Sequence, residues 1–171
     1  MTLLGDILRS YRSPGRVLRR RMAGERREAA ALATLMLGCA LIYVAQWPRL
    51  ARAAESDPGI DLQARLAGAL LAWIFIAPLL FYGLAALSHL GARALGGRGS
   101  FFAARLALFW ALLAAAPLWV LWGALSGLPG PGVLQDVVGI AALVAFFGIW
   151  GAGLAAVERR PAPETSGVSR T

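Results

Sequence analysis

Few side chains in this 171-residue chain have the types and spacing that catalysis or metal binding requires. His89 is the one histidine and Cys39 the one cysteine, whereas a zinc site needs several such ligands at short spacing. Ser88 precedes His89, but adjacent side chains on a helix point about 100° apart, which does not make a nucleophile–base pair. The sequence therefore predicts no catalytic residue, no cofactor, no metal site and no internal disulfide.

Two ionisable residues lie at the edges of long apolar segments. His89 lies four residues before Arg93, so the two share a helix face on which an imidazole could sense pH or meet a lipid headgroup. A histidine at the membrane interface with no special role explains the same position, and we favour that interpretation. Asp136 follows a loop closely enough to stabilise the first turn of a helix through the helix dipole.

The most distinctive polar segment is rich in glycine. It lacks the Lys-Ser/Thr pair of a phosphate-binding P-loop, and no strand is expected before it. Glycines permit a positive φ and a tight reversal, and arginine holds such a loop on an anionic leaflet. We therefore predict a cytoplasmic surface loop whose residues are Gly96, Gly97, Arg98, Gly99, Ser100 and Phe101.

Long apolar helices must position these residues. The chain is 58% hydrophobic with a mean hydropathy of +0.64, above the roughly 45–50% apolar content of soluble domains. A bilayer core about 30 Å thick requires roughly 20 apolar helical residues. Four segments meet that length, at about 29–47, 66–92, 106–126 and 137–157. The predicted fold is all-α, an integral membrane bundle of four transmembrane helices.

Prolines and glycines predict breaks within and between these spans. Pro48 is expected to close the first span. Pro78 and Pro117 lie inside the second and third spans, where each removes a helical hydrogen bond and should kink its helix. The glycines and prolines of residues 127–132 predict a short connection that makes the third and fourth spans antiparallel neighbours.

The arginines predict the orientation. All 17 basic residues are arginine, and the net charge is +8. Fourteen of them lie before the first span, in the second loop or after the fourth span, against three in the first loop. This bias fits an even number of spans with both termini in the cytoplasm. We expect a multi-pass protein of the cytoplasmic (inner) membrane that meets anionic lipids at its cytoplasmic face and does not bind nucleic acid.

Residues 1–28 form a basic N-terminal segment before the transmembrane domain at 29–157. Ser13 and Pro14 have the types of an N-cap and a first helical residue, and they open a second basic helix. The helix before it, over residues 2–12, is predicted to be amphipathic and to lie on the cytoplasmic leaflet. Its apolar face carries Leu4, Ile7, Leu8 and Tyr11. A disordered arm that only sets topology is the alternative.

Residues 158–171 are rich in proline, serine and threonine, and we predict a disordered tail. The pairs Gly123/Gly127 and Gly148/Ala152 have the small-xxx-small spacing that lets membrane helices approach closely.

A family resemblance rests on two short stretches. Residues 95–101, LGGRGSF, precede an apolar span with Pro117 near its middle, and this arrangement resembles the Yip1 domain family of small multi-spanning membrane proteins. The family's segment before the first span is similar to a pattern here that consists of Arg12, Ser13, Pro14 and Val17. The resemblance covers roughly residues 7–157 and is closest to bacterial-type members.

The resemblance implies a membrane protein without an assigned biochemical activity. Family members generally have five spans, against the four counted here. The Asp-Leu-Tyr-Gly-Pro motif of eukaryotic members is absent, so their trafficking role with Rab GTPases is not implied.

Two functions remain open. The first is a non-enzymatic membrane protein that organises or binds other membrane components, including further copies of itself, through small-residue helix faces and a basic surface. The second is a small transporter or permeation path, because the breaks at Pro78 and Pro117 expose carbonyl groups that can line a site.

Overall fold

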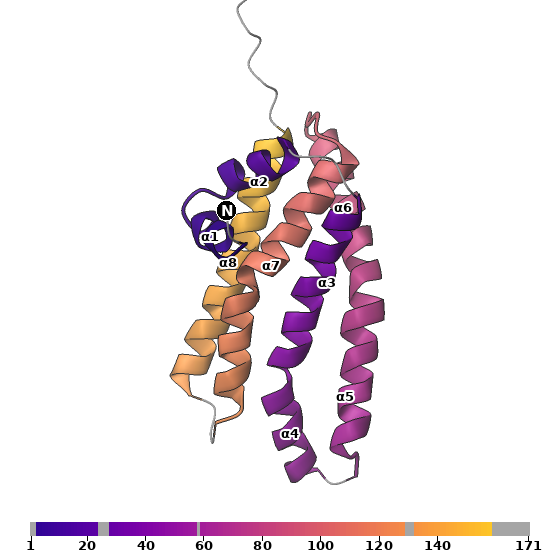
Figure 1. Ribbon diagram of the computed structural model, residues 1–171, viewed down its shortest axis with the longest axis vertical. Coiled ribbons are helices and arrows are strands. Elements are labelled where there is room, and N and C mark those ends of the chain that lie inside the picture. The colour runs from indigo at the N-terminus through magenta and orange to yellow at the C-terminus, as the bar shows by residue number, and fades with distance from the viewer. Residues whose placement is uncertain (1–2, 24–27, 58, 129–131, 159–171) are drawn as a thin grey trace, which may run out of the picture.

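The computed structural model describes residues 3–23, 28–57, 59–128 and 132–158, and the regular secondary structure in these ranges is helical (Figure 1). The helices are α1 (Leu3–Ser10), α2 (Pro14–Ala23), α3 (Glu28–Ala45), α4 (Trp47–Ser56), α5 (Leu62–Leu71), the π-helix η1 (Ala72–Ile76), α6 (Ala77–Ala94), α7 (Phe101–Ser126) and α8 (Val133–Glu158). Of the predicted disordered tail at 158–171, Glu158 is instead the last residue of α8, and residues 159–171 lie outside the described residues.

Within these ranges, four helical segments are long and apolar enough to cross a membrane: Glu28–Ser56, Leu62–Ala94, Phe101–Ser126 and Val133–Glu158. α3 with α4 forms the first, α5 with η1 and α6 the second, and α7 and α8 the third and fourth. The predicted all-α membrane bundle of four spans is confirmed, and the chain is a membrane protein.

The ends of the spans differ from the prediction because capping residues, and not hydropathy, set them. The expectation that Pro48 closes the first span is wrong. The chain turns at Gln46, and α4 begins at Trp47 with Pro48 in its first turn, where a missing N–H leaves no helical bond unmade. The second span begins earlier than expected, at Leu62, because the side chain of Asp61 accepts a hydrogen bond from Ala64 N at 2.8 Å.

The predicted loop residues Ser100 and Phe101 belong to the start of the third span. Ser100 is the N-cap of α7, and its side chain accepts a hydrogen bond from Ala103 N at 3.2 Å. Phe101 is the first helical residue. The loop between α6 and α7 is therefore shorter than the sequence suggested.

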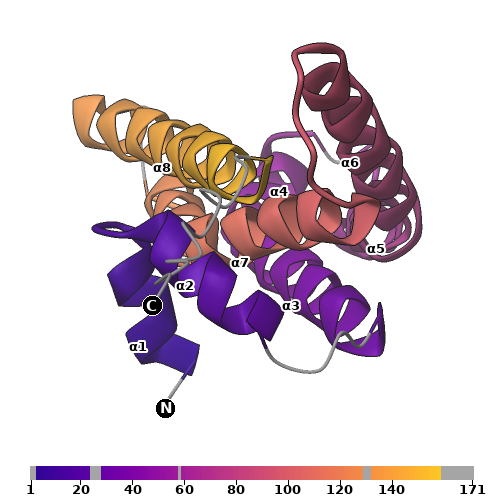
Figure 2. The same cartoon turned by 90° about the horizontal axis from the view of Figure 1, so that it is seen from above.

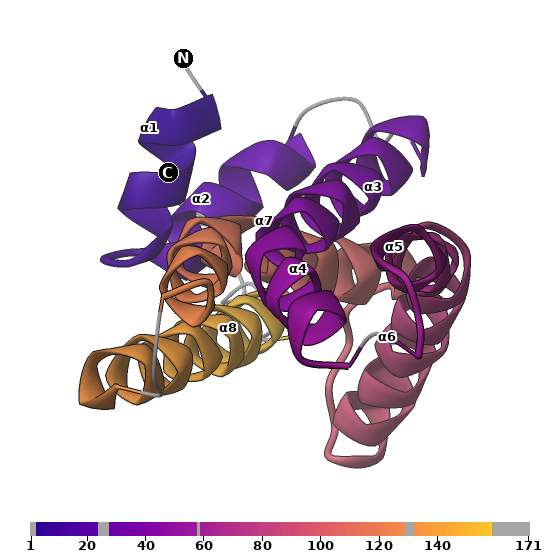
Figure 3. The same cartoon turned by 90° about the horizontal axis from the view of Figure 1, so that it is seen from below.

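Helix α7 is the central element of the bundle. In the most apolar stretch of α7, 67% of the residues are buried, whereas 11% are buried in the corresponding stretch of Leu62–Ala94. Viewed along the bundle, α8 and the N-terminal helices lie to one side of α7 and α6 lies to the other (Figures 2 and 3). α7 changes direction part-way along its length (Figure 1), and Pro117 is the residue inside it that lacks a backbone N–H.

The predicted small-residue pair Gly123 and Gly127 makes a close helix contact inside the bundle. A Cβ at Gly123 would lie 1.9 Å from the carbonyl oxygen of Ala45, and a Cβ at Gly127 would lie 2.6 Å from Pro48 Cβ. The backbone of α7 thus contacts the junction of α3 and α4 directly, and only glycine permits that approach.

The second span contains its own backbone break. η1 ends where Ala77 N donates to Ala72 O, an i→i+5 bond, immediately before Pro78. π-helical turns of this kind widen the helix by one residue. Pro78 itself is buried, while long apolar side chains of the span such as Phe75, Leu79 and Leu87 are more than 60% exposed and face the surroundings.

The N-terminal helices turn polar side chains toward the protein and leave apolar side chains exposed. Residues 3–23 form two helices that pack against α7 and α8 (Figure 2). In α1, Asp6 and Ser10 of the polar face are buried together with Ile7, whereas Leu4 and Leu8 are 69% and 71% exposed. The predicted amphipathic helix exists, but its polar face turns toward the protein.

Candidate functional site

The glycine-rich loop ends α6 with a left-handed turn. Gly96 has φ +89°, a conformation that favours glycine. Gly97 N donates to Ala92 O at 2.8 Å and Gly96 N to Arg93 O at 3.0 Å, so two carbonyl groups left over at the helix end find partners. The tight reversal expected from the glycines is therefore formed at Gly96.

The remaining glycines make room for an acidic side chain from α8. The carboxylate of Glu158 accepts a hydrogen bond from Gly99 N at 2.7 Å, and its backbone carbonyl accepts one from Arg98 N at 3.3 Å. A Cβ at Gly97 would lie 2.5 Å from Glu158 Oε2, and a Cβ at Gly99 would lie 2.8 Å from Glu158 Cδ. The loop sequence thus fits around the last residue of the fourth span.

His89 completes this arrangement from α6. Its Nδ1 lies 3.0 Å from Glu158 Oε1, and with Glu158 as a carboxylate the ring N–H is the donor. The side chains of His89 and Glu158 are only 2% and 8% exposed. The ring centroid of Phe101 lies 4.2 Å from that of His89. We call His89, Gly99 and Glu158 the Glu158 network, and it ties α6, the loop and α8 together.

The structure changes the interpretation of His89. The sequence suggested an interfacial imidazole on one face with Arg93, but the ring is buried against protein while Arg93 is exposed. The Oγ of Ser88 donates to Ala85 O at 2.9 Å within its own helix and takes no part in the Glu158 network. This geometry holds helices in place, and it does not set up a nucleophile beside a base.

An open groove of about 780 Å³ runs between α6 and α8 beside the Glu158 network. Small residues make up much of its walls, including Gly91 and Ala92 on α6 and Gly151 and Ala155 on α8. The lining is completed by Ser88, Leu95, Gly96, Gly97, Arg98, Trp150, Leu154 and Glu158. We call it the α6–α8 groove.

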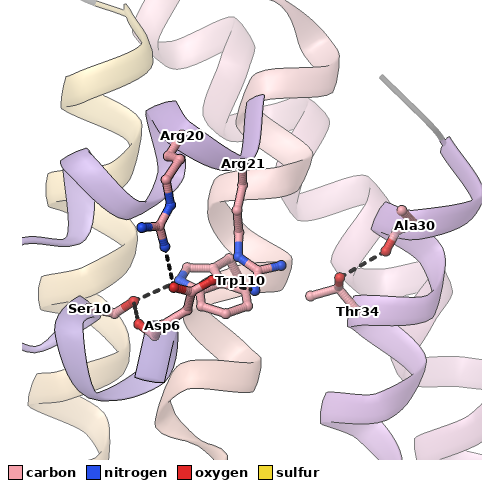
Figure 4. Close-up of polar contacts among 7 residues, drawn as sticks. All are labelled: Asp6, Ser10, Arg20, Arg21, Ala30, Thr34 and Trp110. Carbon is pink, nitrogen blue, oxygen red and sulfur yellow. Dashed lines mark hydrogen bonds and ion pairs between the residues drawn. The ribbon is translucent and has the colours of Figure 1, made fainter. Parts of the chain in front are cut away.

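A second polar cluster holds the N-terminal helices in place (Figure 4). Trp110 Nε1 of α7 donates to Ser10 Oγ at 2.8 Å, and Ser10 Oγ donates to Asp6 O at 2.8 Å. The carboxylate of Asp6 accepts hydrogen bonds from Arg20 and from Arg21, the latter at 3.0 Å. The Arg21 guanidinium lies 3.7 Å from the Trp110 ring centroid, a cation–π contact. These five residues form the N-terminal clamp.

The titration of the clamp follows from its surroundings. Burial alone raises the pKa of Asp6, but the hydrogen bonds and charges of Arg20 and Arg21 outweigh it, and the pKa lies below its usual value. Tyr11, next along the chain, donates its hydroxyl to Ala114 O at 2.9 Å, and burial raises its pKa. At neutral pH the clamp is an ion pair and a set of fixed donors, which suits a structural role.

A smaller cavity of about 340 Å³ lies between the spans on the side away from the loop. Its walls are mainly aromatic, with Gln46 and Arg49 as the polar residues. Among the described residues, no group of three or more His, Cys, Asp or Glu side chains could hold a metal ion.

The family model described as the Yip1 domain matches residues 8–163, nearly the whole chain. The chain belongs to the Yip1 domain family. No curated protein and no solved structure matches it. The resemblance based on the LGGRGSF loop and Pro117 is confirmed, and the described part of this Yip1 domain contains four helical segments able to span a membrane.

The match takes in the glycine loop, His89 and Glu158, and it begins within α1. Sequence reasoning on this Yip1 domain found the loop and His89 but missed Glu158 and the N-terminal clamp. One signal for Glu158 was available: it is the acid at the end of the fourth apolar segment, which four-span topology places at the same membrane face as His89. For Ser10 no comparable signal existed, since its partner Trp110 lies about one hundred residues away in the chain. The partners of Asp6, Arg20 and Arg21, lie in the next helix, among several arginines that local sequence does not tell apart.

Proposed function

We propose that this Yip1-type membrane protein is a non-enzymatic organiser that binds a transmembrane helix of a protein partner in the α6–α8 groove. A helix is the proposed occupant because the groove walls combine small residues with an apolar lining, and small residues let helix backbones approach within van der Waals contact in lipid. A second copy of the chain is one such partner.

The observation that supports this proposal is the different use of the small residues in α7 and α8. Residues of α3 and α4 occupy the space next to Gly123 and Gly127, whereas a Cβ at Gly148 or Gly151 would meet nothing within 4 Å. Gly151 and Ala155 line the groove, and Gly148 and Ala152 are exposed next to it. A face that can receive a helix is therefore left open on α8.

The proposed location is the cytoplasmic membrane, with both termini in the cytoplasm. The support is the arginine bias, combined with a fold that brings α2, the glycine loop and the end of α8 to one end of the bundle (Figure 1). The exposed arginines at this end, such as Arg93 and Arg98, would then face anionic lipid headgroups.

Photo-crosslinking in native membranes tests the helix partner. The chain has no lysine, so amine-reactive reagents are poorly suited. A cysteine placed by Ala152→Cys in a Cys39→Ala background can carry a benzophenone maleimide at the exposed rim of the groove. We expect one constant adduct, either a dimer of this chain or a complex with one other membrane protein.

A matched pair of variants decides whether the adduct depends on the groove. Gly151→Leu fills the groove, while Gly83→Leu places the same side chain at an exposed α6 position with nothing within 4 Å. The adduct should be lost with Gly151→Leu and retained with Gly83→Leu. Recovery of monomer alone, or an adduct insensitive to Gly151→Leu, contradicts the proposal.

A permeation path is the second candidate, favoured by the π-helix before Pro78 and by the cavity that Trp73 of η1 lines. The mainly aromatic lining of that cavity offers few groups for a polar solute, which is why we rank it second. Flux measured in proteoliposomes tests it, and tight vesicles with no solute or ion flux above that of empty vesicles would remove it.

A further inference from the structure

An arginine-lined pocket opens between α1 and α2, and none of its lining residues lines the α6–α8 groove. Figure 2 shows these two helices on the side of α7 away from α6. It has a volume of about 710 Å³. Its lining is Leu8, Arg9, Arg12, Ser13, Arg16, Val17 and Arg20. We call it the arginine pocket. No part of the helix-binding proposal above depends on it.

Positive charge in this pocket is concentrated and only partly neutralised. Four of the lining residues are arginines, and none of the lining residues is acidic. Arg20 forms an ion pair with Asp6, and Arg16 donates a hydrogen bond to Ser13 Oγ at 2.6 Å. Guanidinium groups present planar pairs of N–H donors that match phosphate oxygens.

The backbone adds to this positive field. Ser13 O accepts hydrogen bonds from Arg16 N at 3.2 Å and Val17 N at 3.3 Å, so α2 starts at the pocket. The N-terminus of a helix carries partial positive charge and favours a phosphate group. Side-chain charge and helix dipole therefore act on the same space.

Packing places the pocket at the end of the bundle where a headgroup layer would lie. α2 contacts the last turns of α8, since a Cβ at Gly15 would lie 2.8 Å from Ala156 Cβ and a Cβ at Gly153 would lie 3.3 Å from the Leu18 side chain. α1 lies deeper along α7, where Tyr11 reaches the carbonyl of Ala114. α2, which lines the pocket together with α1, thus lies against the end of the fourth span.

An apolar strip borders the same pocket. Leu8, one of its lining residues, is 71% exposed, and Leu4, one helical turn away, is 69% exposed. These side chains face away from the protein because Asp6 and Ser10 occupy the inner face of α1. Arginines on one side could contact the charged headgroup of a phospholipid, and exposed leucines on the other could contact its acyl chains.

We propose that the arginine pocket binds the phosphate-bearing headgroup of an anionic membrane lipid, with its acyl chains lying along Leu4 and Leu8. Arg9, Arg12 and Arg16 contact the phosphate oxygens, and the start of α2 adds a helix-dipole contribution. Free phosphate shares the headgroup chemistry but cannot use the leucines, so the test separates the two sources.

The test uses the full chain, purified and delipidated in mild detergent, with bound lipid counted by native mass spectrometry. The probes are phosphatidic acid, diphosphatidylglycerol and zwitterionic phosphatidylcholine. We expect the two anionic lipids to bind with a higher affinity than phosphatidylcholine, and millimolar inorganic phosphate not to displace them. Equal affinity for all three lipids, or displacement by inorganic phosphate, overturns the lipid assignment.

Two double variants separate the pocket from general electrostatic attraction. Arg12→Gln with Arg16→Gln removes two charges from the pocket and leaves the N-terminal clamp intact. Arg19→Gln with Arg93→Gln removes two exposed charges from residues that line neither the pocket nor the α6–α8 groove. We expect about a tenfold or greater loss of affinity for the anionic lipids in the first and little change in the second.

Equal losses in the two double variants would mean that a diffuse basic surface, and not a pocket, attracts the lipid. Circular dichroism and the thermal midpoint in detergent should match wild type for both. A Leu4→Ser and Leu8→Ser variant, whose changes lie on exposed positions, should also weaken lipid binding, and unchanged binding there would refute the acyl-chain contact.

Discussion

Replacement of Asp6 by asparagine is expected to release the N-terminal helices from the bundle. The carboxylate holds Arg20 and Arg21, and Arg21 in turn lies over Trp110. Asparagine keeps the size of the side chain but removes the charge and one acceptor oxygen. The four membrane spans do not depend on this contact, so the effect should be confined to α1 and α2.

The size of the effect follows from the exposure of the three side chains. Asp6 is 10% exposed, Arg21 27% and Arg20 42%. A buried hydrogen bond to a charged group contributes about 1.5–3 kcal/mol, and an exposed ion pair contributes about 0.2–1 kcal/mol. Because the exposure of these side chains lies between the buried and the exposed case, we expect the free energy of opening α1 and α2 to fall by about 2 kcal/mol. This corresponds to a roughly 30-fold increase in the opening equilibrium constant.

Hydrogen exchange of the α1 and α2 amides measures this opening directly. At pH 7, protection in Asp6→Asn should fall by the stated factor, while amides of α7 and α8 remain as in wild type. Arg19→Gln, an exposed neighbour in α2, serves as the matched control and should change protection by less than about 0.5 kcal/mol.

The pH dependence gives a second check. Because the pKa of Asp6 is lowered in the folded protein, its stabilising contribution is present above the unfolded pKa of about 3.9 and is lost as the pH falls through the lower, folded value. Wild-type protection of α1 and α2 should therefore decline in acid below about pH 4, and Asp6→Asn should lack this decline. Wild-type protection in the variant at pH 7, or the same acid decline in both proteins, would refute the reasoning.

Further predictions address packing, the Glu158 network and topology. Gly123→Ala places a Cβ 1.9 Å from the carbonyl oxygen of Ala45, so the thermal midpoint in detergent should drop by the equivalent of about 1–3 kcal/mol, whereas Gly148→Ala, with open space around it, should leave the midpoint near wild type. Glu158→Ala leaves the buried His89 ring and the partly buried Gly99 N–H without their acceptor, and a loss of about 2 kcal/mol is expected in the same assay; an unchanged midpoint would contradict the network. Reporter fusions at the C-terminal end should read cytoplasm and those within residues 55–61 the outside, and the opposite pattern would overturn the proposed orientation.

The number and approximate place of the spans could be predicted from the sequence because hydropathy depends only on local composition. The span ends could not, because they depend on single capping side chains. Asp61 and Ser100 each accept a backbone hydrogen bond and begin a helix several residues before the apolar stretch does. Pro48 illustrates the opposite error, since a residue expected to end a helix is tolerated in the first turn of the next.

Helical periodicity showed which residues of α1 share a face but not which face meets the protein. The polar residues Asp6 and Ser10 face the protein because Trp110, Arg20 and Arg21 supply partners for them there. Those partners come from other helices, and no local pattern encodes their position. The same limit explains why His89 was recognised as unusual while its partner Glu158, 69 residues away, was not.

The position of the Glu158 network constrains how the α6–α8 groove can open. The network joins α6 to α8 at one end of the groove, and its imidazole and carboxylate are nearly excluded from solvent. Separating them inside a membrane would leave a charge and two N–H groups without partners, a larger cost than parting apolar surfaces. A helix that enters the groove should therefore part α6 from α8 at the end of the groove far from the network, while the glycine loop holds the other end fixed. We expect the second span to make most of this movement, because 11% of its most apolar stretch is buried, against 28% in the fourth span.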